Sequence, residues 1–233
     1  MGATQYARLR EEAFLANMEI PKRNLALYTW GNVSAYDAQE AVFAIKPSGV
    51  PYDRLSMNDI VVVDLDGKVV EGTLRPSSDM ETHRVLYRSF PKIGGITHTH
   101  STHAVAWAQA GLSVPVFGTT HADHSHLPIP CTPFMSRAQV EGNYEEETGK
   151  LIVATFKDIP YLEQPMVLVA GHGPFAWGKD ATTSVYNAAV LEEVSRMAYL
   201  TLSINPAAVS LPEHIIQKHY QRKHGPNAYY GQK

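Results

Sequence analysis

The sequence has few of the features that would assign a protein to a membrane, to nucleic acid or to an oxidising compartment. Its 20 lysines and arginines are balanced by 23 aspartates and glutamates, so no basic excess indicates nucleic acid or a membrane surface as a partner. A single cysteine, Cys131, excludes a disulfide within the chain. No run approaches the ~20 apolar residues of a membrane span, and the polar start MGATQYARLREEAF lacks the apolar core of a signal peptide. We therefore expect a cytoplasmic protein with no membrane or nucleic-acid partner.

The chain has an ordinary globular composition in which helical and strand patterns alternate. Its 233 residues are 44% hydrophobic and suit a single domain, with no repeats or linkers. Helices are predicted over residues 5–20 (ended by Pro21), 78–90 (with a capping box of Ser78 and Glu81), 104–111, 136–157, 180–203 and 213–223. Strands are predicted over 25–30, 41–46, 60–72 (a hairpin turning at Asp66-Gly67), 94–100 and 165–173. These patterns predict an α/β fold with three α/β/α layers around a mainly antiparallel sheet.

Histidines and one carboxylate lie where a metal site would need them. His98 and His100 follow an apolar strand, and side chains two apart on a strand share one face. His172 follows a second apolar strand between two glycines, and Asp79 opens the predicted helix before His98. Three imidazoles and a carboxylate suit zinc, and they also admit manganese or cobalt. Taken singly, the histidines have ordinary surface or core explanations, and an aspartate at a helix start meets the helix dipole favourably.

Three small polar turns have the chemistry to hold a phosphate group. Hydroxyls and backbone N–H groups in such turns bind anions, although the same residues are also common turn and capping residues. The pairs are Gly31-Asn32, Ser48-Gly49 and Ser77-Ser78.

Eight stretches resemble, in order, the motifs of the class II aldolase/adducin-like family and, within it, those of the epimerases that act on pentulose 5-phosphates. They are LYTWGNVSA (27–35), IKPSGV (45–50), EGTLRPSSDMETH (71–83), GGITHTHSTHAVAWAQAG (94–111), GTTHAD (118–123), IPCT (129–132), HGPFAWG (172–178) and KHYQRKHGPNAYYGQ (218–232). The resemblance implies one α/β/α domain over 1–233 that assembles as a C4 homotetramer. It implies active sites at subunit interfaces, to which the tail of about 218–233 contributes from a neighbouring subunit.

The resemblance also implies the ligands of the site. It implies a zinc ion in each subunit, held by Asp79, His98, His100 and His172, and contacts from the three turn pairs to the phosphate of a small pentulose 5-phosphate. Lys46 is a further candidate for a charge near that phosphate.

The residue at position 79 separates two activities within the family. Aldolases of this family carry a glutamate there that works in proton transfer, whereas the epimerases carry the shorter aspartate as a metal ligand. Asp79 therefore favours an epimerase. Such an enzyme interconverts L-ribulose 5-phosphate and D-xylulose 5-phosphate by breaking and re-forming the bond between carbons 3 and 4. Asp123 and Tyr230 match its catalytic acid/base pair, with Thr119 and His219 as supporting contacts.

Two alternatives remain open at this stage. A related class II aldolase would release its aldehyde fragment, and an adducin-like module would bind partners without catalysis. The motifs are also shared by relatives in arabinose, ascorbate and gulonate breakdown, so they indicate carbohydrate metabolism without fixing the pathway.

Overall fold

A seven-stranded sheet forms the centre of the protein. The computed structural model describes residues 5–231, so the last two residues of the predicted tail, Gln232 and Lys233, lie outside the described residues. The strand order is β4-β3-β2-β1-β5-β7-β6, and each neighbouring pair is antiparallel. The strands are β1 (Asn32–Asp37), β2 (Val42–Ile45), β3 (Val61–Asp64), β4 (Val69–Glu71), β5 (Gly95–His98), β6 (Met166–Val169) and β7 (Gly173–Gly178).

Helices cover both faces of this sheet, because alternate strand residues are apolar on both sides. On β2, Val42 and Ala44 join a core with α1, α3 and α7, whereas Phe43 and Ile45 join a second core with α2 and α6. The three-layer α/β/α prediction is confirmed. The helices are α1 (Ala7–Lys22), α2 (Met80–Ser89), α3 (Thr102–Ala110), α4 (Thr119–Ala122), α5 (Arg137–Glu141), α6 (Tyr144–Thr155), α7 (Ala181–Ile204) and α8 (Glu213–His224), with a 3₁₀ turn at Met57–Asp59.

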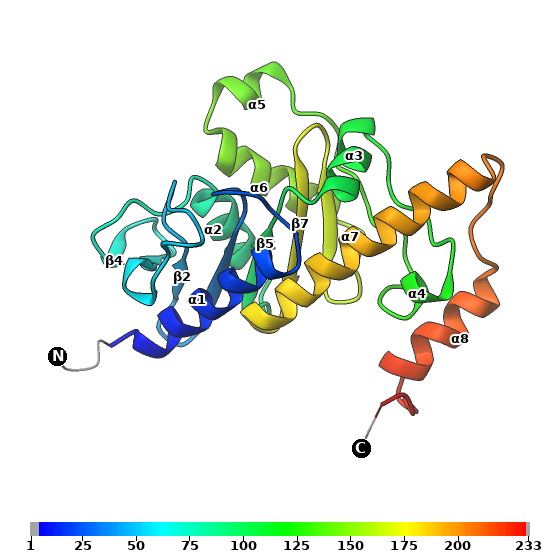
Figure 1. Cartoon of the computed structure of the whole chain (residues 1–233), viewed down its shortest axis with the longest axis horizontal. Coiled ribbons are helices and arrows are strands. Elements are labelled where there is room, and N and C mark those ends of the chain that lie inside the picture. Colours follow the sequence, from blue (N-terminus) through cyan, green and yellow to red (C-terminus); the bar gives the residue numbers. More distant parts are fainter. Residues whose placement is uncertain (1–4, 232–233) are drawn as a thin grey trace.

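One part of the chain lies outside these two cores. Ala122 of α4 and Ile216 of α8 pack together with Val116, which precedes α4, and Figure 1 shows the two helices at the opposite end of the molecule from β4. Between residues 5 and 231, no helix combines the length and the apolar character needed to cross a membrane.

Most predicted elements are confirmed with small shifts at their ends. The hairpin over 60–72 forms β3 and β4, and the tail helix over 213–223 is α8. The long helix over 180–203 is α7, where the side chain of Asp180 accepts a hydrogen bond from the backbone N–H of Thr183 at 2.7 Å. The helix over 136–157 is divided into α5 and α6.

Local turns explain where the strand and helix predictions were wrong. Residues 25–30 are not a strand, because Trp30 N–H donates to Leu27 O in a turn and Tyr28 has a φ of 53°. The strand begins instead at Asn32, and β1 and β7 were both missed as strands. Helix α1 continues past Pro21 to Lys22, since a proline so close to the end removes only one helical hydrogen bond.

The capping box predicted at Ser78 and Glu81 does not form. Helix α2 begins after Asp79, which makes no side-chain cap. Glu81 pairs with Arg84 at 2.8 Å from Nε, and the carboxylate of Asp79 accepts a hydrogen bond from Asn32.

Candidate metal and phosphate site

Three imidazoles meet at the end of β5. His98 is the last residue of that strand, and His172 lies in the tight turn between β6 and β7. His100 lies beyond the strand and not on it, which corrects the argument from strand alternation. The ligand nitrogens of the three histidines nevertheless lie within 4.8 Å of one another, and the Nε2 atoms of His98 and His100 are 3.2 Å apart.

Hydrogen bonding and burial prepare these histidines to act as ligands. Nδ1 of His98 contacts Pro174 O at 2.9 Å, so it carries the proton and leaves the Nε2 lone pair free. Burial lowers the pKa of His98 to about 3 and also lowers the pKa values of His100 and His172. All three are therefore neutral near pH 7, which is the state that binds metal.

Asp79 and Asn32 stand beside the imidazoles. The β1–β5 register places Asn32 opposite His98, and Asn32 Nδ2 donates to Asp79 Oδ2 at 2.7 Å. Gly31 permits this close approach, because its φ is 72° and a Cβ there would lie 2.7 Å from His98 O. Burial opposes the charge of Asp79, yet the neighbouring His98 and His83 and the hydrogen bond from Asn32 leave its pKa below the ordinary value. Asp79 is not within the tight three-histidine group, but it faces the same cavity.

The residues fit a divalent cation on their own chemistry. Two imidazole nitrogens face each other at hydrogen-bond distance, and Nδ1 of His172 is buried without a partner in residues 5–231. Three neutral nitrogens with a nearby carboxylate are a donor set typical of catalytic zinc sites, which keep one position open. Imidazole and carboxylate ligands alone do not select zinc over manganese or cobalt.

One cavity of about 390 Å³ contains all ten residues predicted to bind metal or phosphate. It brings together the three turn pairs, which are far apart in the sequence, because β1 begins, β2 ends and α2 begins at this edge. The members are Gly31, Asn32, Ser48, Gly49, Ser77, Ser78, Asp79, His98, His100 and His172. The cavity also includes Trp30, Tyr144 and Glu145, which the sequence analysis missed.

Lys46 is a buried cation in the wall of this cavity. Its side chain is 1% exposed, and its two hydrogen bonds, to Thr29 O at 3.5 Å and Pro47 O at 3.4 Å, are long. Burial lowers the pKa of Lys46 to about 8. The ring of Tyr52, whose centre is 5.0 Å from Lys46 Nζ, compensates the charge only in part, so an anion in the cavity would stabilise the ammonium. Its place in this wall agrees with the expectation from the sequence that Lys46 could add a charge near the phosphate.

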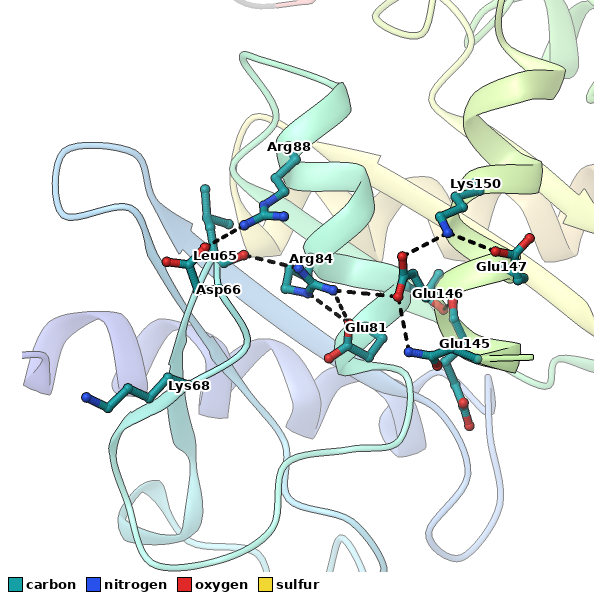
Figure 2. Close-up of polar contacts among 12 residues, drawn as sticks. Leu65, Asp66, Lys68, Glu81, Arg84, Arg88, Glu145, Glu146, Glu147 and Lys150 are labelled. Carbon is teal, nitrogen blue, oxygen red and sulfur yellow. Dashed lines mark hydrogen bonds and ion pairs between the residues drawn. The ribbon is translucent and has the colours of Figure 1, made fainter. Parts of the chain in front are cut away.

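Helix α6 brings Tyr144 and Glu145 to the cavity by packing on α2. Thr82 Oγ1 donates to Glu145 O at 2.6 Å, which fixes the first turn of α6 against α2. Arg84 adds an ion pair with Glu146 at 4.0 Å, and Figure 2 shows Arg84 between the two helices and the β3–β4 turn. In the sequence, the run NYEEET is typical of an acidic first helical turn and carries no signal that Glu145 would line a cavity.

The predicted acid/base pair lies elsewhere in the chain. Asp123, at the end of α4, accepts hydrogen bonds from Arg222 at 2.7 and 3.0 Å and from His219 at 3.0 Å. Burial raises the pKa of Asp123, but these bonds outweigh it and hold the pKa below the ordinary value. Tyr230 is 60% exposed and stacks over Lys223 and Arg222, with 4.4 Å from Lys223 Nζ to the ring centre.

Neither member of this pair lines the cavity of the three histidines. Asp123 instead faces a separate cavity of about 370 Å³ between α7 and α8. Of the supporting residues, His219 contacts Asp123, whereas Thr119 begins α4 and makes no side-chain hydrogen bond within residues 5–231. The roles of Asp123 and Tyr230 remain predictions.

Sequence and structure together define a class II aldolase-type protein. The model of the Class II Aldolase and Adducin N-terminal domain family matches residues 11–199, and the chain belongs to this family. Solved structures agree on the fold. An L-fuculose 1-phosphate aldolase is 23% identical, with a TM-score of 0.78 over 92% of this chain and 95% of that one. The L-fuculose-1-phosphate aldolase from Thermus thermophilus is also 23% identical, with a TM-score of 0.64 over 88% of this chain and 100% of that one.

Among curated sequences the chain is similar to several proteins named L-ribulose-5-phosphate 4-epimerase UlaF. The L-ribulose-5-phosphate 4-epimerase UlaF of Salmonella paratyphi B is 54% identical over 226 residues, which are 97% of this chain and 99% of that protein. UlaF of Salmonella typhi is 53% identical over the same shares of the two chains.

Proposed function

We propose that this protein is a zinc-dependent L-ribulose-5-phosphate 4-epimerase. The observation that carries the proposal is the single cavity in which three converging imidazoles and Asp79 face three polar turns and the buried Lys46. The imidazoles and Asp79 suit a cation, whereas the polar turns and Lys46 suit a phosphate. Their combination in about 390 Å³ matches a small sugar phosphate. The identity of 54% to an epimerase across nearly the whole chain supports the same substrate.

At the cation end, His98, His100, His172 and Asp79 would hold zinc. A zinc ion held there would supply Lewis acidity for the cleavage of the sugar. Asn32 holds the Asp79 carboxylate through its hydrogen bond of 2.7 Å, so the carboxylate keeps one orientation before substrate arrives.

At the other end, the turns hold the phosphate throughout the reaction. Ser48-Gly49 and Ser77-Ser78 offer hydroxyl and backbone donors, and Lys46 offers a charge without strong partners of its own. This anchoring matters, because the two-carbon aldehyde phosphate must stay bound after the bond between carbons 3 and 4 breaks. It then turns over and rejoins with the opposite configuration.

The proton transfers need one group on each face of the sugar. A base removes the proton of the carbon 4 hydroxyl, and the electron pair of the broken bond stays on the three-carbon fragment. After rotation, an acid on the opposite face returns a proton to the new hydroxyl. We assign these roles to Asp123 and Tyr230. Because the two lie outside the cavity of their own chain, the proposal includes a C4 homotetramer in which a neighbouring subunit completes the site.

The test is incubation of the purified protein with L-ribulose 5-phosphate, with and without a chelator. We expect D-xylulose 5-phosphate as the product, and we expect the chelator to stop its formation. Release of dihydroxyacetone and glycolaldehyde phosphate with little epimer would instead show an aldolase. Protein that retains no metal and leaves L-ribulose 5-phosphate unchanged would contradict both enzymatic functions. It would indicate a binding module of the adducin type.

A further inference from the structure

Tyr52 is a buried tyrosine behind the wall of the cavity, and the proposed function gives it no role. It is 5% exposed and does not line the cavity itself. Its hydroxyl donates to Trp30 O at 2.9 Å and to Gly31 O at 3.1 Å, and its ring centre lies 5.0 Å from Lys46 Nζ. All three of these residues line the cavity, so one side chain joins a turn and a cation of its wall.

The hydroxyl of Tyr52 sets the direction of one peptide group in that turn. A trans peptide points its C=O and its N–H in opposite directions, so the bond from Tyr52 to Trp30 O aims the N–H of Gly31 away from Tyr52. This N–H donates no hydrogen bond within residues 5–231. Burial raises the pKa of Tyr52, so the hydroxyl keeps the hydrogen that it donates. The Gly31 N–H is therefore held ready for an anion in the cavity.

The ring of Tyr52 holds the ammonium of Lys46 without neutralising it. An aromatic face attracts a cation within about 6 Å of its centre, and the attraction is stronger when both groups are buried, as they are here. A carboxylate at this place would form an ion pair and cancel the charge. The ring forms no ion pair, so the charge of Lys46 stays available to an anion.

Tyr52 also belongs to the loop that carries another of the polar turns. This loop follows β2, and Ser48-Gly49 lies in it shortly before Tyr52. The two bonds from the hydroxyl therefore hold this loop against the turn that contains Gly31. They fix the spacing between two of the groups that face the cavity.

We propose that Tyr52 is a positioning residue for the phosphate group of the substrate. Its hydroxyl holds the Gly31 turn against the loop of Ser48-Gly49, and its ring holds the ammonium of Lys46 at the cavity wall. This inference rests on the proposed function, because it needs the phosphate to bind at this end of the cavity.

Two substitutions separate the hydroxyl from the ring. Tyr52→Phe removes only the hydroxyl, so we expect it to weaken the binding of inorganic phosphate by about 3–10-fold, the worth of one hydrogen bond. Tyr52→Leu also removes the ring, so we expect it to weaken this binding by about 2–5-fold more. The measurements are the inhibition constant of phosphate and the KM for L-ribulose 5-phosphate. We expect kcat and zinc content to change little, whereas a general loss of structure would lower them as well.

The Lys46→Met background tests whether the ring acts through the charge of Lys46. In that background we expect Tyr52→Phe and Tyr52→Leu to weaken phosphate binding equally, because the ring no longer has a cation to hold. An extra loss in Tyr52→Leu that persists there would show an effect of packing and would overturn the role of the ring. If Tyr52→Leu does not fold, as judged by circular dichroism, the proposal stands or falls on Tyr52→Phe.

Tyr161→Phe is the matched control, since it also removes a hydroxyl that donates to a backbone carbonyl, that of Pro91, away from this cavity. We expect it to leave the phosphate constants unchanged. Constants in Tyr52→Phe equal to those of the wild type, or a loss of the same size in Tyr161→Phe, would overturn the proposal.

The wild-type protein separates this inference from the proposed function. If the wild type forms no epimer and does not bind phosphate, the proposed function fails and the role of Tyr52 fails with it. If it does both and Tyr52→Phe matches it, only the role of Tyr52 fails.

Discussion

The cavity of the three histidines and the cluster around Asp123 are both rich in charged and titratable side chains. They differ in how far their polar atoms already have hydrogen-bond or ion-pair partners. In the cavity, imidazole nitrogens converge and the ammonium of Lys46 has only long hydrogen bonds. In the cluster, the Asp123 carboxylate is already satisfied by Arg222 and His219. The cavity is thus prepared for ligands, whereas the cluster is internally paired and needs another surface before it can exchange protons.

This difference suggests that ligand binding and proton transfer belong to two different parts of the chain. In the proposed function, the strands of the central sheet supply the ligand-binding half, because β1 begins, β5 ends and the β6–β7 turn lies at one edge. In the proposed function, the α4–α8 unit, which lies apart from both sheet cores, supplies the proton-transfer half. Under the proposed function, the two halves meet between neighbouring subunits.

The largest effect is expected from breaking the ligand-binding half. His98→Asn removes the central imidazole, so we expect loss of bound zinc and a fall in epimerase activity of about 10⁴-fold or more, since a metal contributes several kcal/mol. Metal analysis and product formation measure the two effects. His214→Asn, on the exposed surface of α8, is the matched control. Full zinc occupancy in His98→Asn would remove His98 from the ligand set.

Substitution of Tyr230 tests the other half without disturbing the first. We expect Tyr230→Phe to lower kcat by about 10²–10⁴-fold, the usual contribution of a general acid or base, while zinc content and KM change little. Tyr229→Phe, at a neighbouring and similarly exposed position, is the control. A kcat near the wild-type value in Tyr230→Phe would exclude Tyr230 from proton transfer.

Asp123→Asn is expected to reduce both kcat and stability, and in this it differs from Tyr230→Phe. Removing the charge leaves Arg222 and His219 without their partner, so we expect a lower free energy of unfolding at pH 7. The folded pKa of Asp123 lies below its ordinary value, so the stabilisation is present above about pH 4 and is lost as the pH falls through the folded pKa. Denaturant titrations at pH 7 and at low pH measure the difference. An equal difference between wild type and variant at both values would contradict this account of the cluster.

Lys46→Met is expected to have the smallest effect, a loss of affinity for phosphate that depends on pH. Below about pH 8 the wild-type Lys46 is charged, so the variant should bind inorganic phosphate about 10–100-fold more weakly, the worth of a charged hydrogen bond. Above that pH the wild type loses the charge and the gap should narrow. Inhibition by phosphate across the pH range measures this, with Lys68→Met in the β3–β4 turn as the control. A constant gap would show that the charge of Lys46 is not what binds phosphate.

Features that depend on local sequence patterns could be predicted, whereas features that depend on packing between distant segments could not. The layers and the ten cavity residues were predicted because apolar periodicity and ordered motifs are local signals. Strands β1 and β7 were missed, since a positive φ at Tyr28 and the glycines around His172 obscure where extended structure begins. Glu145 reaches the cavity because α2 packs on α6, and His83 contacts Ser34 because α2 packs on β1. No local pattern in the sequence predicts either contact.

Subunit mixing tests the central claim, that the two halves come from different copies of the chain, most directly. His98→Asn and Tyr230→Phe would be co-expressed with different tags, and tetramers containing both would be purified. If each site uses the histidines of one subunit and the tyrosine of its neighbour, random mixing restores about a quarter of the sites, because half the subunits keep each group. We therefore expect activity near one quarter of the wild-type value. Activity no higher than that of the two single variants would contradict a shared site.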